Sequence, residues 1–481
     1  MISRPILKLF NNSKLATNFA MPIMNGAKVM EQHSYELSSD FTAEDGTPAA
    51  WAPNMPSHWG LESNKLLLDC KPNIYNALDL SGDDSLLAVV LGKSIYIFSV
   101  ADLQLREELV GHTEDIQTVI FAVKHHAGHT LISSTSSTVI FWELNDKGED
   151  LNAKEAIDTD DIAQSALESV LRELKCEFVS EASNSLTSDF KIGLAAAGAQ
   201  KELENKIVLK GSLGNFGSDV FSRDGEYMFT LSNNDSTQQG MREEDLLPCI
   251  EVRNAETKEV IHRLKGHTDA VMWIGASPDS KKLATVAWDG TVRIWSLRTG
   301  FCLHTFGSFG GQMWAGAWSP NSQYLAFTQN SPKTIIYVYN SETAEEVSKY
   351  TGIKSWARSI AWSPDGKYLA SGSQNAAVVV YDPMTGEEKK KWEHKFGIEN
   401  ERMMKGYLAT DCVQFVGSKL IFKTTEGTIE LYDFNSNLKS QFTGGPEDKV
   451  DSTVCDGLKV SHDGSFLVSV DADKAVRFWK L

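Results

Sequence analysis

Cysteine is scarce in this chain, and its placement excludes a scaffold built on disulfides. The 481 residues include six cysteines, and no two of them are close enough to form a CxxC clip. So few thiols in a chain of this length are typical of reduced, buried cysteines in an intracellular protein. The six are Cys70, Cys176, Cys249, Cys302, Cys412 and Cys455. Long apolar runs are missing too: no 18 consecutive residues are apolar, so we expect no membrane span.

Basic residues are too few for a chain that binds nucleic acid broadly. Lys and Arg number 46 against 64 for Asp and Glu, which gives a formal net charge of −18. A field of that sign repels phosphate backbones. Hydrophobic residues make up 42%, which is enough for a large core and excludes disorder as the main state. The composition therefore predicts a globular protein without general nucleic-acid binding.

Acidic residues are missing from residues 1–30, which carry four basic residues. This pattern is similar to a mitochondrial presequence, and the long apolar core of a secretory signal is absent. A disordered basic tail, or an internal start at Met21 or Met24, explains the pattern as well. We expect an intracellular protein, cytoplasmic or nuclear, with a mitochondrial location as the alternative. Residues 31–65 are rich in Ser, Pro, Ala and Asn, so residues 1–65 are predicted to form a flexible N-terminal extension.

One short turn recurs along the chain and sets its period. Its copies are SGDD at 81–84, SRDG at 222–225, SPDS at 277–280, SPNS at 319–322, SPDG at 363–366 and SHDG at 461–464. Each copy lies between two short β-rich runs, which predicts a hairpin. The residue before each turn, or its equivalent, gives a register: Leu80, Phe121, Phe221, Ala276, Trp318, Trp362, Phe415 and Val460. A period of about 40–45 residues with four strands per unit is typical of a propeller blade.

The pattern is most complete in residues 266–297. These residues contain Gly266-His267, the SPD turn, Thr285, Trp288-Asp289 and Trp295. This text resembles the repeat of the WD-repeat β-propeller family, and the other units are degraded copies. The resemblance covers about residues 66–481. It implies an all-β fold, a single WD-repeat β-propeller with eight four-stranded blades, or with seven as the alternative.

Three inner strands are expected in each of the eight blades. They fall near 74–100, 116–143, 216–254, 271–296, 313–340, 357–382, 408–434 and 455–480. A short run before each set can form the outer strand of the preceding blade. The run LLLDC at 66–70 has no preceding blade, so we expect it to pair with the last blade. Such a closure removes the open edges of a sheet.

An acidic segment separates the second predicted blade from the third. Within residues 145–205, apolar residues recur at helical spacing over 162–178, and Asp158 or Thr159 can cap that helix. We therefore predict a helical insertion. Its apolar stripe either docks on the side of the propeller or binds another protein.

His267, Thr285 and Asp289 have the composition of a catalytic triad. The resemblance implies another role for them. In the family, the matching residues and the matching tryptophan, here Trp295, form a buried hydrogen-bond chain, a structural tetrad that locks the loops of a blade. No HExxH, GxSxG or CxxCH pattern occurs in the sequence. We therefore predict no catalytic residues and no cofactor.

Two further patterns suggest ligand binding only weakly. The string HHAGH places His125, His126 and His129 in a hairpin loop without a nearby Cys or acid, so an exposed polar loop explains it as well as a metal site does. The string GSLGNFG at 211–217 lacks the helix and the lysine of a phosphate-binding loop. We predict no metal site.

The resemblance also implies where a partner binds. In WD-repeat proteins, the position four residues before the register residue lines the mouth of the central channel, and Trp288 faces the same side. The predicted partner-binding residues are Trp314, Arg358, Met272, Trp288, Asn76, Gln117, Asp411 and Asp456. Tryptophan and arginine are enriched at binding hot spots. We therefore predict a non-enzymatic scaffold that binds a protein or peptide at this mouth.

Two other functions remain open at this point. The chain can be a fixed structural subunit of a larger assembly, without a peptide pocket. It can also be an enzyme that uses the central channel. The first alternative and the scaffold both imply protein partners, with the chain as a monomer or as one subunit of a hetero-complex.

Overall fold

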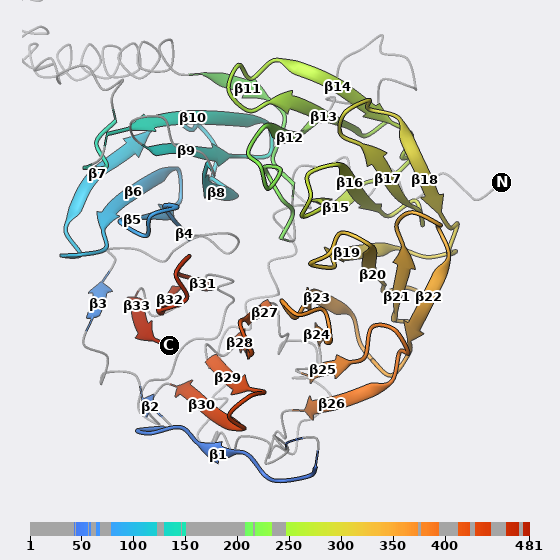
Figure 1. The fold of residues 1–481 in the computed structure, drawn as a ribbon. Coiled ribbons are helices and arrows are strands. Elements are labelled where there is room, and N and C mark those ends of the chain that lie inside the picture. The colour runs from blue at the N-terminus through green and yellow to red at the C-terminus, as the bar shows by residue number, and fades with distance from the viewer. Residues whose placement is uncertain are drawn as a thin grey trace, which may run out of the picture.

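A computed structural model gives the structure of the protein. It describes residues 43, 45–55, 57–58, 64–67, 78–122, 129–145, 147–150, 207–214, 217–232, 247–373, 377–393, 412–423, 429–443, 458–470 and 475–481. Every regular element in these ranges is a β-strand, and eight sheets form a ring (Figure 1). The all-β propeller with eight blades is therefore confirmed, and the seven-bladed alternative is wrong.

The first half of the ring contains blades 1 to 4. Blade 1 consists of β4 (Leu78–Leu80), β5 (Leu86–Leu91), β6 (Ser94–Ser99) and β7 (Leu105–Val110). Blade 2 consists of β8 (Thr118–Phe121), β9 (His129–Ser134), β10 (Thr138–Leu144) and β11 (Val208–Lys210). Blade 3 consists of β12 (Tyr227–Ser232), β13 (Cys249–Asn254) and β14 (Val260–Lys265). Blade 4 consists of β15 (Val271–Ala276), β16 (Lys282–Ala287), β17 (Val292–Ser296) and β18 (Cys302–Phe306).

The second half contains blades 5 to 8. Blade 5 consists of β19 (Met313–Trp318), β20 (Tyr324–Gln329), β21 (Ile335–Asn340) and β22 (Glu346–Tyr350). Blade 6 consists of β23 (Ala357–Trp362), β24 (Leu369–Ser373), β25 (Ala377–Tyr381) and β26 (Glu388–Glu393). Blade 7 consists of β27 (Cys412–Val416), β28 (Lys419–Lys423), β29 (Ile429–Asp433) and β30 (Leu438–Thr443). Blade 8 consists of β31 (Leu458–Val460), β32 (Phe466–Val470), β33 (Ala475–Lys480) and β3 (Asn64–Leu67).

Blade 3 departs from the regular pattern at its inner edge. It has three named strands, and isolated bridges from Ser212 to Leu231 and from Phe221 to Met228 put Ser212 and Phe221 beside β12, at the inner edge. Gly211 and Gly217, from the string GSLGNFG, have φ angles of 125° and 72°. L side chains rarely adopt such angles, so these glycines serve the path of the backbone between blades 2 and 3.

The ring closes through a strand from the N-terminal part of the chain. β3 pairs antiparallel with β33, with Asn64 opposite Phe478 and Leu67 opposite Ala475. The predicted closure with the last blade is confirmed, although the strand covers Asn64–Leu67 rather than residues 66–70. An apolar cluster shared by blades 8 and 1, which includes Val468 and Leu78, completes the same junction.

Two more strands come from residues that the sequence assigned to a flexible extension. β1 (Ala50–Trp51) and β2 (Ser57–His58) both pair in parallel with β30, the outer strand of blade 7. Figure 1 shows them, in blue, along the rim of that blade. Part of the range 1–65 is therefore paired to the propeller. Sequence periodicity did not reveal this, because two-residue strands are too short to show alternation.

Apolar clusters between neighbouring blades form the core. Eight clusters occur among the described residues, and each contains residues of two adjacent blades. Strands with a blade on both faces are buried throughout, as in β5 and β16, whereas β7 at the rim has a single buried residue. Burial on both faces explains why the inner strands are continuous apolar runs in the sequence.

The recurring turn makes the same hydrogen bonds in six copies. Its first residue, a serine, donates to the Asp or Asn two positions later at 2.5–2.7 Å. The same serine oxygen accepts the backbone N–H five positions later at 2.9–3.0 Å. These local bonds favour the turn over an extended chain, and the recurrence of Ser and Asp in the sequence follows from them.

Some turns also bind the neighbouring blade. The Ser280 and Ser322 side chains accept the backbone N–H groups of Asp224 and Asp279, each at 3.0 Å. At the closing junction, Asp84 of blade 1 accepts the backbone N–H of His462 at 3.0 Å. These contacts hold the turns of successive blades in register.

The predicted helical insertion at 145–205 lies almost wholly outside the described residues. Only residues 145 and 147–150 of it are described, and Asp150 forms a bridge back to Leu144 at the end of β10. β11 then continues blade 2 as its outer strand, paired with β10. The insertion is therefore connected between the third and fourth strands of blade 2, rather than between blades 2 and 3.

Candidate functional site

The predicted tetrad is assembled in blade 4. The His267 ring contacts Asp289 Oδ2 through Nδ1 at 2.8 Å and Thr285 Oγ1 through Nε2 at 2.7 Å. The Trp295 indole N–H donates to Thr285 Oγ1 at 3.0 Å. His267 and Thr285 are almost completely buried, and the Asp289 side chain is 5% exposed. This series of hydrogen bonds connects strand β17 through β16 to the loops at the end of the blade.

Asp289 holds two loops as well as the histidine. It accepts the backbone N–H of Thr268 at 3.0 Å, and the backbone N–H and hydroxyl of Thr291 at 2.8 and 2.7 Å. Burial by itself raises the pKa of Asp289, but the hydrogen bonds and charge of His267 and the bonds from Thr291 and Thr268 outweigh it and lower the pKa to about 2. Its carboxylate is therefore fully engaged in structure.

Thr285 has no geometry for nucleophilic catalysis. The Thr285 residue is 0% exposed. Its hydroxyl oxygen already contacts the His267 imidazole and the Trp295 indole. A nucleophile must reach a substrate atom, and this oxygen is enclosed within the blade. The arrangement fits the structural tetrad that the resemblance implied.

Two other blades contain shorter versions of the tetrad. In blade 2, Ser133 Oγ lies 2.7 Å from His112 Nε2 and accepts the Trp142 indole N–H at 2.8 Å. In blade 8, Ser469 accepts the Trp479 indole N–H at 3.1 Å. Burial lowers the pKa of His112 to about 4. The repetition of the motif around the ring supports a structural role, since a single active site is not expected in several partial copies.

Three tryptophans form a row at one end of blades 4 to 6. Trp288, in the turn between β16 and β17, lies 5.4 Å from Trp314 of β19, measured between ring centroids. Trp314 lies 5.5 Å from Trp356, in the loop before β23. Trp356 is 36% exposed, and the other two are half-buried. We call Trp288, Trp314 and Trp356 the tryptophan row.

Backbone contacts fix the first member of the row. Trp288 donates its backbone N–H to the Ala270 carbonyl at 2.9 Å, and Phe309 donates to the Gly290 carbonyl at 3.0 Å. A Cβ atom on Gly290 would lie 3.1 Å from the Gly311 carbonyl oxygen. The glycines in the loop between blades 4 and 5 therefore let the two loops pack closely and position the indole of Trp288.

The other predicted partner-binding residues are distributed unevenly. Arg358 is half-buried on β23, Gln117 is exposed before β8, and Met272 is 7% exposed, so little of its surface is open to a partner. Asn76, Asp411 and Asp456 lie outside the described residues. The sequence missed Trp356, because it lies in the loop before the strand and the register rule considers only one position of the strand itself.

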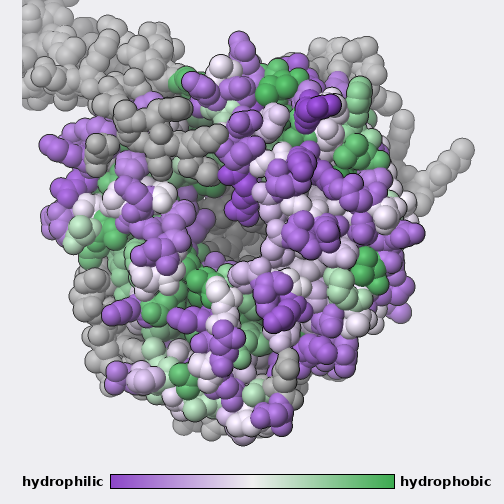
Figure 2. Space-filling view, viewed as in Figure 1, coloured by the Kyte–Doolittle hydropathy of each residue, from purple (hydrophilic) through white to green (hydrophobic). Residues whose placement is uncertain are grey.

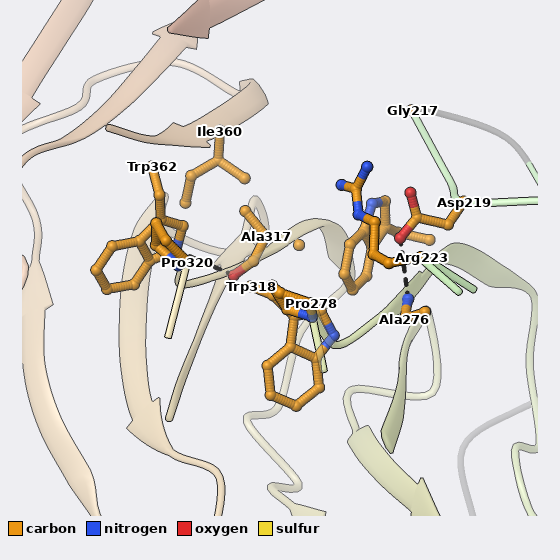
Figure 3. Close-up of a pocket in the computed structure, with 12 residues that line it drawn as sticks. Gly217, Asp219, Arg223, Ala276, Pro278, Ala317, Trp318, Pro320, Ile360 and Trp362 are labelled. Atoms are coloured by element: carbon orange, nitrogen blue, oxygen red, sulfur yellow. Dashed lines mark hydrogen bonds between the residues drawn. The ribbon is translucent and has the colours of Figure 1, made fainter. Parts of the chain in front are cut away.

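A cavity opens at the other end of the same blades. Its volume is about 330 Å³. The register residues Trp318 and Trp362 line it and donate their indole N–H groups to carbonyls of the preceding blade, those of Gly275 and Ala317. Asp219 lies beside Arg223 at the edge of the cavity and accepts the backbone N–H of Ala276 at 3.0 Å (Figure 3). Burial raises the pKa of Asp219, and Arg223 opposes that shift.

Histidine-based metal binding gains no support from the described part of the chain. His129 is 6% exposed, and its Nε2 atom lies 3.7 Å from Asp83 Oδ2. It also contacts the Phe121 ring edge-on, so this histidine is part of the interior rather than of an exposed loop. His125 and His126 lie outside the described residues, within which no group of three His, Cys, Asp or Glu side chains is arranged for a metal ion.

The surface is mostly hydrophilic around a hollow at the centre of the ring (Figure 2). In the part of the chain that the structure describes, no helix has the length and apolar character to cross a membrane. The fold and the tetrad together define the class of protein: a β-propeller with WD-type blades.

Comparison with known families leads to the same class. The family model "WD domain, G-beta repeat" matches residues 258–296, 344–382 and 439–480. Each match begins at or near the outer strand of one blade and includes the inner strands of the next. The chain therefore forms an eight-bladed β-propeller that contains WD repeats in these three places.

Similar curated proteins cover only part of the chain. Eukaryotic translation initiation factor 3 subunit I of Aspergillus niger is 28% identical over 202 residues, and that of Aspergillus terreus is 30% identical over 203. Both matches cover 40% of this chain and 56% of the relative, so the chain spans about half the length of these relatives. Protein HIR1 of Cryptococcus neoformans is 34% identical over 134 residues, which cover 26% of this chain and 15% of that protein.

A solved structure supports the fold alone. The crystal structure of the computationally designed Ika8 protein superposes with a TM-score of 0.55 at 14% sequence identity. The match covers 86% of this chain and 98% of the designed one.

Proposed function

We propose that this protein is a non-enzymatic scaffold that binds a protein or peptide partner at the mouth of its central channel, through the tryptophan row. The observation that carries the proposal is the gathering of Trp288, Trp314 and Trp356 at centroid distances of 5.4 and 5.5 Å. Three blades contribute one indole each. Aromatic groups that remain accessible outside a core are typical of binding hot spots.

Core packing does not account for the row. The core clusters between blades 4 and 5 and between blades 5 and 6 contain Trp318 and Trp362, but none of the three indoles of the row. Neighbouring indoles that contact one another at a tilt offer a partner a rigid apolar surface at a low cost in side-chain entropy. A proline, an aliphatic side chain or another aromatic ring of a peptide fits such a surface.

Arg358 adds a polar contact to the proposed site. It is half-buried on β23, two residues after Trp356. A guanidinium can bind a carboxylate with two parallel hydrogen bonds, so we infer that the partner places an acidic side chain or a chain end there. The predicted acids Asp411 and Asp456 lie outside the described residues and add nothing to the argument.

Relatives favour a role in a multi-protein complex. The two Aspergillus relatives described above are named as a subunit of a translation initiation factor. By analogy we propose that this chain is also a subunit of a complex, and that it acts in the cytoplasm. The absence of a free nucleophile in the tetrad argues against the enzyme alternative, because His267, Thr285 and Asp289 all serve the blade.

Affinity purification with mass spectrometry tests the proposal. The full-length chain, a Trp314→Ala variant and a Trp356→Ala variant serve as baits, and Phe301→Ala is the matched control. Phe301 is 74% exposed before β18, away from the row, so its loss removes an exposed aromatic without touching the site. We expect the two row variants to lose a partner that wild type and control retain, with affinity reduced by about thirtyfold or more.

The same experiment separates the scaffold from its alternative. All baits must melt within a few degrees of wild type, so that lost binding does not reflect lost folding. If both row variants keep every wild-type partner at constant stoichiometry, the channel mouth is not the binding site. The fixed structural subunit then becomes the better description.

A further inference from the structure

The outer strand of blade 7 is covered, unlike the outer strands of other blades. In β30, Ser440, Gln441 and Phe442 are buried, and no described side chain of the strand is exposed. By contrast, β7 and β18 each have one buried residue and several exposed ones. The difference arises because β1 and β2, at residues 50–51 and 57–58, pair along β30.

Backbone hydrogen bonds hold this N-terminal strap, as we call residues 43–58. Ala50 donates its backbone N–H to the Asn437 carbonyl at 3.1 Å, and Ala52 donates to the Lys439 carbonyl at 2.9 Å. The strap thus forms an additional parallel strand, with Ala50 opposite Leu438 and Ser57 opposite Phe442. This is the geometry by which sheet edges bind extended peptides.

Side chains of the strap occupy three distinct positions. Ala49 is 8% exposed and belongs to the cluster between blades 6 and 7. Met55 packs against the cluster between blades 7 and 8. Trp51 is 38% exposed, and the Lys439 ammonium lies 4.8 Å from the centroid of one of its rings. A small residue, an aromatic and a long apolar residue therefore each have a defined place.

Polar groups of the propeller bind the first part of the strap. Asn437 Nδ2 donates to the carbonyls of Thr47 and Pro48 at 3.2 and 3.3 Å. Lys390 Nζ donates to the Ala43 carbonyl at 2.8 Å. Lys390 is the middle one of three consecutive lysines on β26. In a chain of net charge −18, Lys390 favours an acidic segment, and Asp45 of the strap interacts electrostatically with it.

We propose that the β30 edge is a peptide-binding surface, that residues 43–58 occupy it within this chain, and that a partner protein binds there by replacing them with an extended segment of the same chemistry. That segment carries acidic residues, then a small residue, an aromatic two positions later, and a long apolar residue four positions after that. The surface lies on blades 6 to 8, so it is independent of the tryptophan row on blades 4 to 6.

Competition within the chain limits binding by the intact protein. A segment tethered by a short linker acts at an effective concentration on the order of millimolar. A free peptide with the same contacts must exceed that concentration to displace the strap. Binding should therefore become measurable when the strap is released.

Proline substitution can release the strap without changing the edge that it leaves. Ala50→Pro with Ala52→Pro removes the two backbone N–H donors by which the β1 part of the strap binds this edge, and keeps every residue of blades 6 to 8. Ala50→Ser with Ala52→Ser is the matched control, because serine keeps both donors. The probe is a labelled synthetic peptide with the sequence of residues 43–58, and fluorescence anisotropy measures its binding to the full-length variants.

We expect the proline variant to bind the probe at least tenfold more tightly than wild type and the serine control. A probe with Asp in place of Trp51 should lose that gain. A gain of less than tenfold, or equal binding of both probes, overturns the proposal. If the proline variant does not fold, the full-length Trp51→Ala variant takes its place. It should also bind the probe at least tenfold more tightly than wild type. Trp314→Ala should leave probe binding unchanged, so this test stands apart from that of the channel mouth.

Discussion

Replacing His267 with alanine should destabilise blade 4, and the structure allows the effect to be estimated. The substitution removes three contacts, to Asp289 at 2.8 Å, Thr285 at 2.7 Å and Thr291 at 3.3 Å, from a side chain that is 0% exposed. Asp289 keeps its bonds from Thr268 and Thr291, and Thr285 keeps the Trp295 indole. The carboxylate is therefore left partly paired, and we expect a loss of about 1–3 kcal/mol in the free energy of unfolding.

The pKa of Asp289 gives a second estimate of the same effect. Its folded-state pKa of about 2 lies below the ordinary value of 3.8. At 1.36 kcal/mol per pKa unit, the net shift corresponds to about 2–3 kcal/mol after burial has opposed it, and His267 is one of several groups that lower the pKa. A depressed carboxyl pKa stabilises the fold above about pH 4, and that contribution is lost as the pH falls toward 2. The difference between wild type and His267→Ala should therefore narrow below about pH 4.

Urea unfolding, followed by tryptophan fluorescence at pH 7 and at several points down to pH 3, measures both effects. His112→Ala in blade 2 is the comparison, because His112 contacts Ser133 but no carboxylate among the described residues. We expect His112→Ala to lose less stability than His267→Ala. The difference in the free energy of unfolding between wild type and His112→Ala should change little below pH 4. Equal losses for the two variants, or a His267 effect that does not depend on acid, would refute the reasoning about Asp289.

Three further predictions follow from packing and closure. Gly316→Ala should lower the melting temperature by several degrees, because the new Cβ would lie 2.4 Å from the buried Trp273 ring. Ala317→Gly, one residue along the same strand, is the control. An unchanged melting temperature for Gly316→Ala in differential scanning fluorimetry would contradict this prediction. Deleting residues 1–72 should destabilise the ring more than deleting residues 1–60, since only the longer deletion removes β3; identical melting curves would show that β3 does not close the ring. Replacing residues 151–206 with a short Gly/Ser bridge should leave a folded propeller, because β10 and β11 on either side already pair; an insoluble product would show that these residues belong to the core.

Most of the fold could be predicted from the sequence because the repeat has a local chemical cause. The Ser–Asp turns fix the ends of the first two strands in six units, and the predicted inner strands of blade 4 at 271–296 agree with β15 to β17. The family resemblance also selected His267, Thr285, Asp289 and Trp295, and the structure joins these four side chains by hydrogen bonds. Blade 6 departs from the pattern of blades 2, 4 and 8, because its Ser371 hydroxyl donates to the Ser359 carbonyl and accepts no bond from Tyr381.

The features that could not be predicted depend on contacts between distant segments. Residues 50–58 have no strand-like alternation, and their pairing with β30 depends on an edge formed almost 400 residues later. Two members of the tryptophan row were selected from the sequence, Trp314 by the register rule and Trp288 as the residue before Asp289, but the position of Trp356 depends on the path of a loop. Whether these residues bind a partner is a question of surface chemistry, to which the repeat pattern does not apply.

Blade 8 has a consequence for the order in which the protein can fold. Its outer strand, β3, is synthesised early, but the strand with which it pairs, β33, is the last in the chain, with Asn64 opposite Phe478. During translation β3 stays unpaired while seven blades form, because its partner strand β33 is synthesised only with blade 8. Joining segments so far apart carries a large cost in loop entropy unless the intervening blades have already brought them together. We therefore expect ring closure to be the last and slowest step of folding, and the stage at which an incomplete chain is most exposed to aggregation.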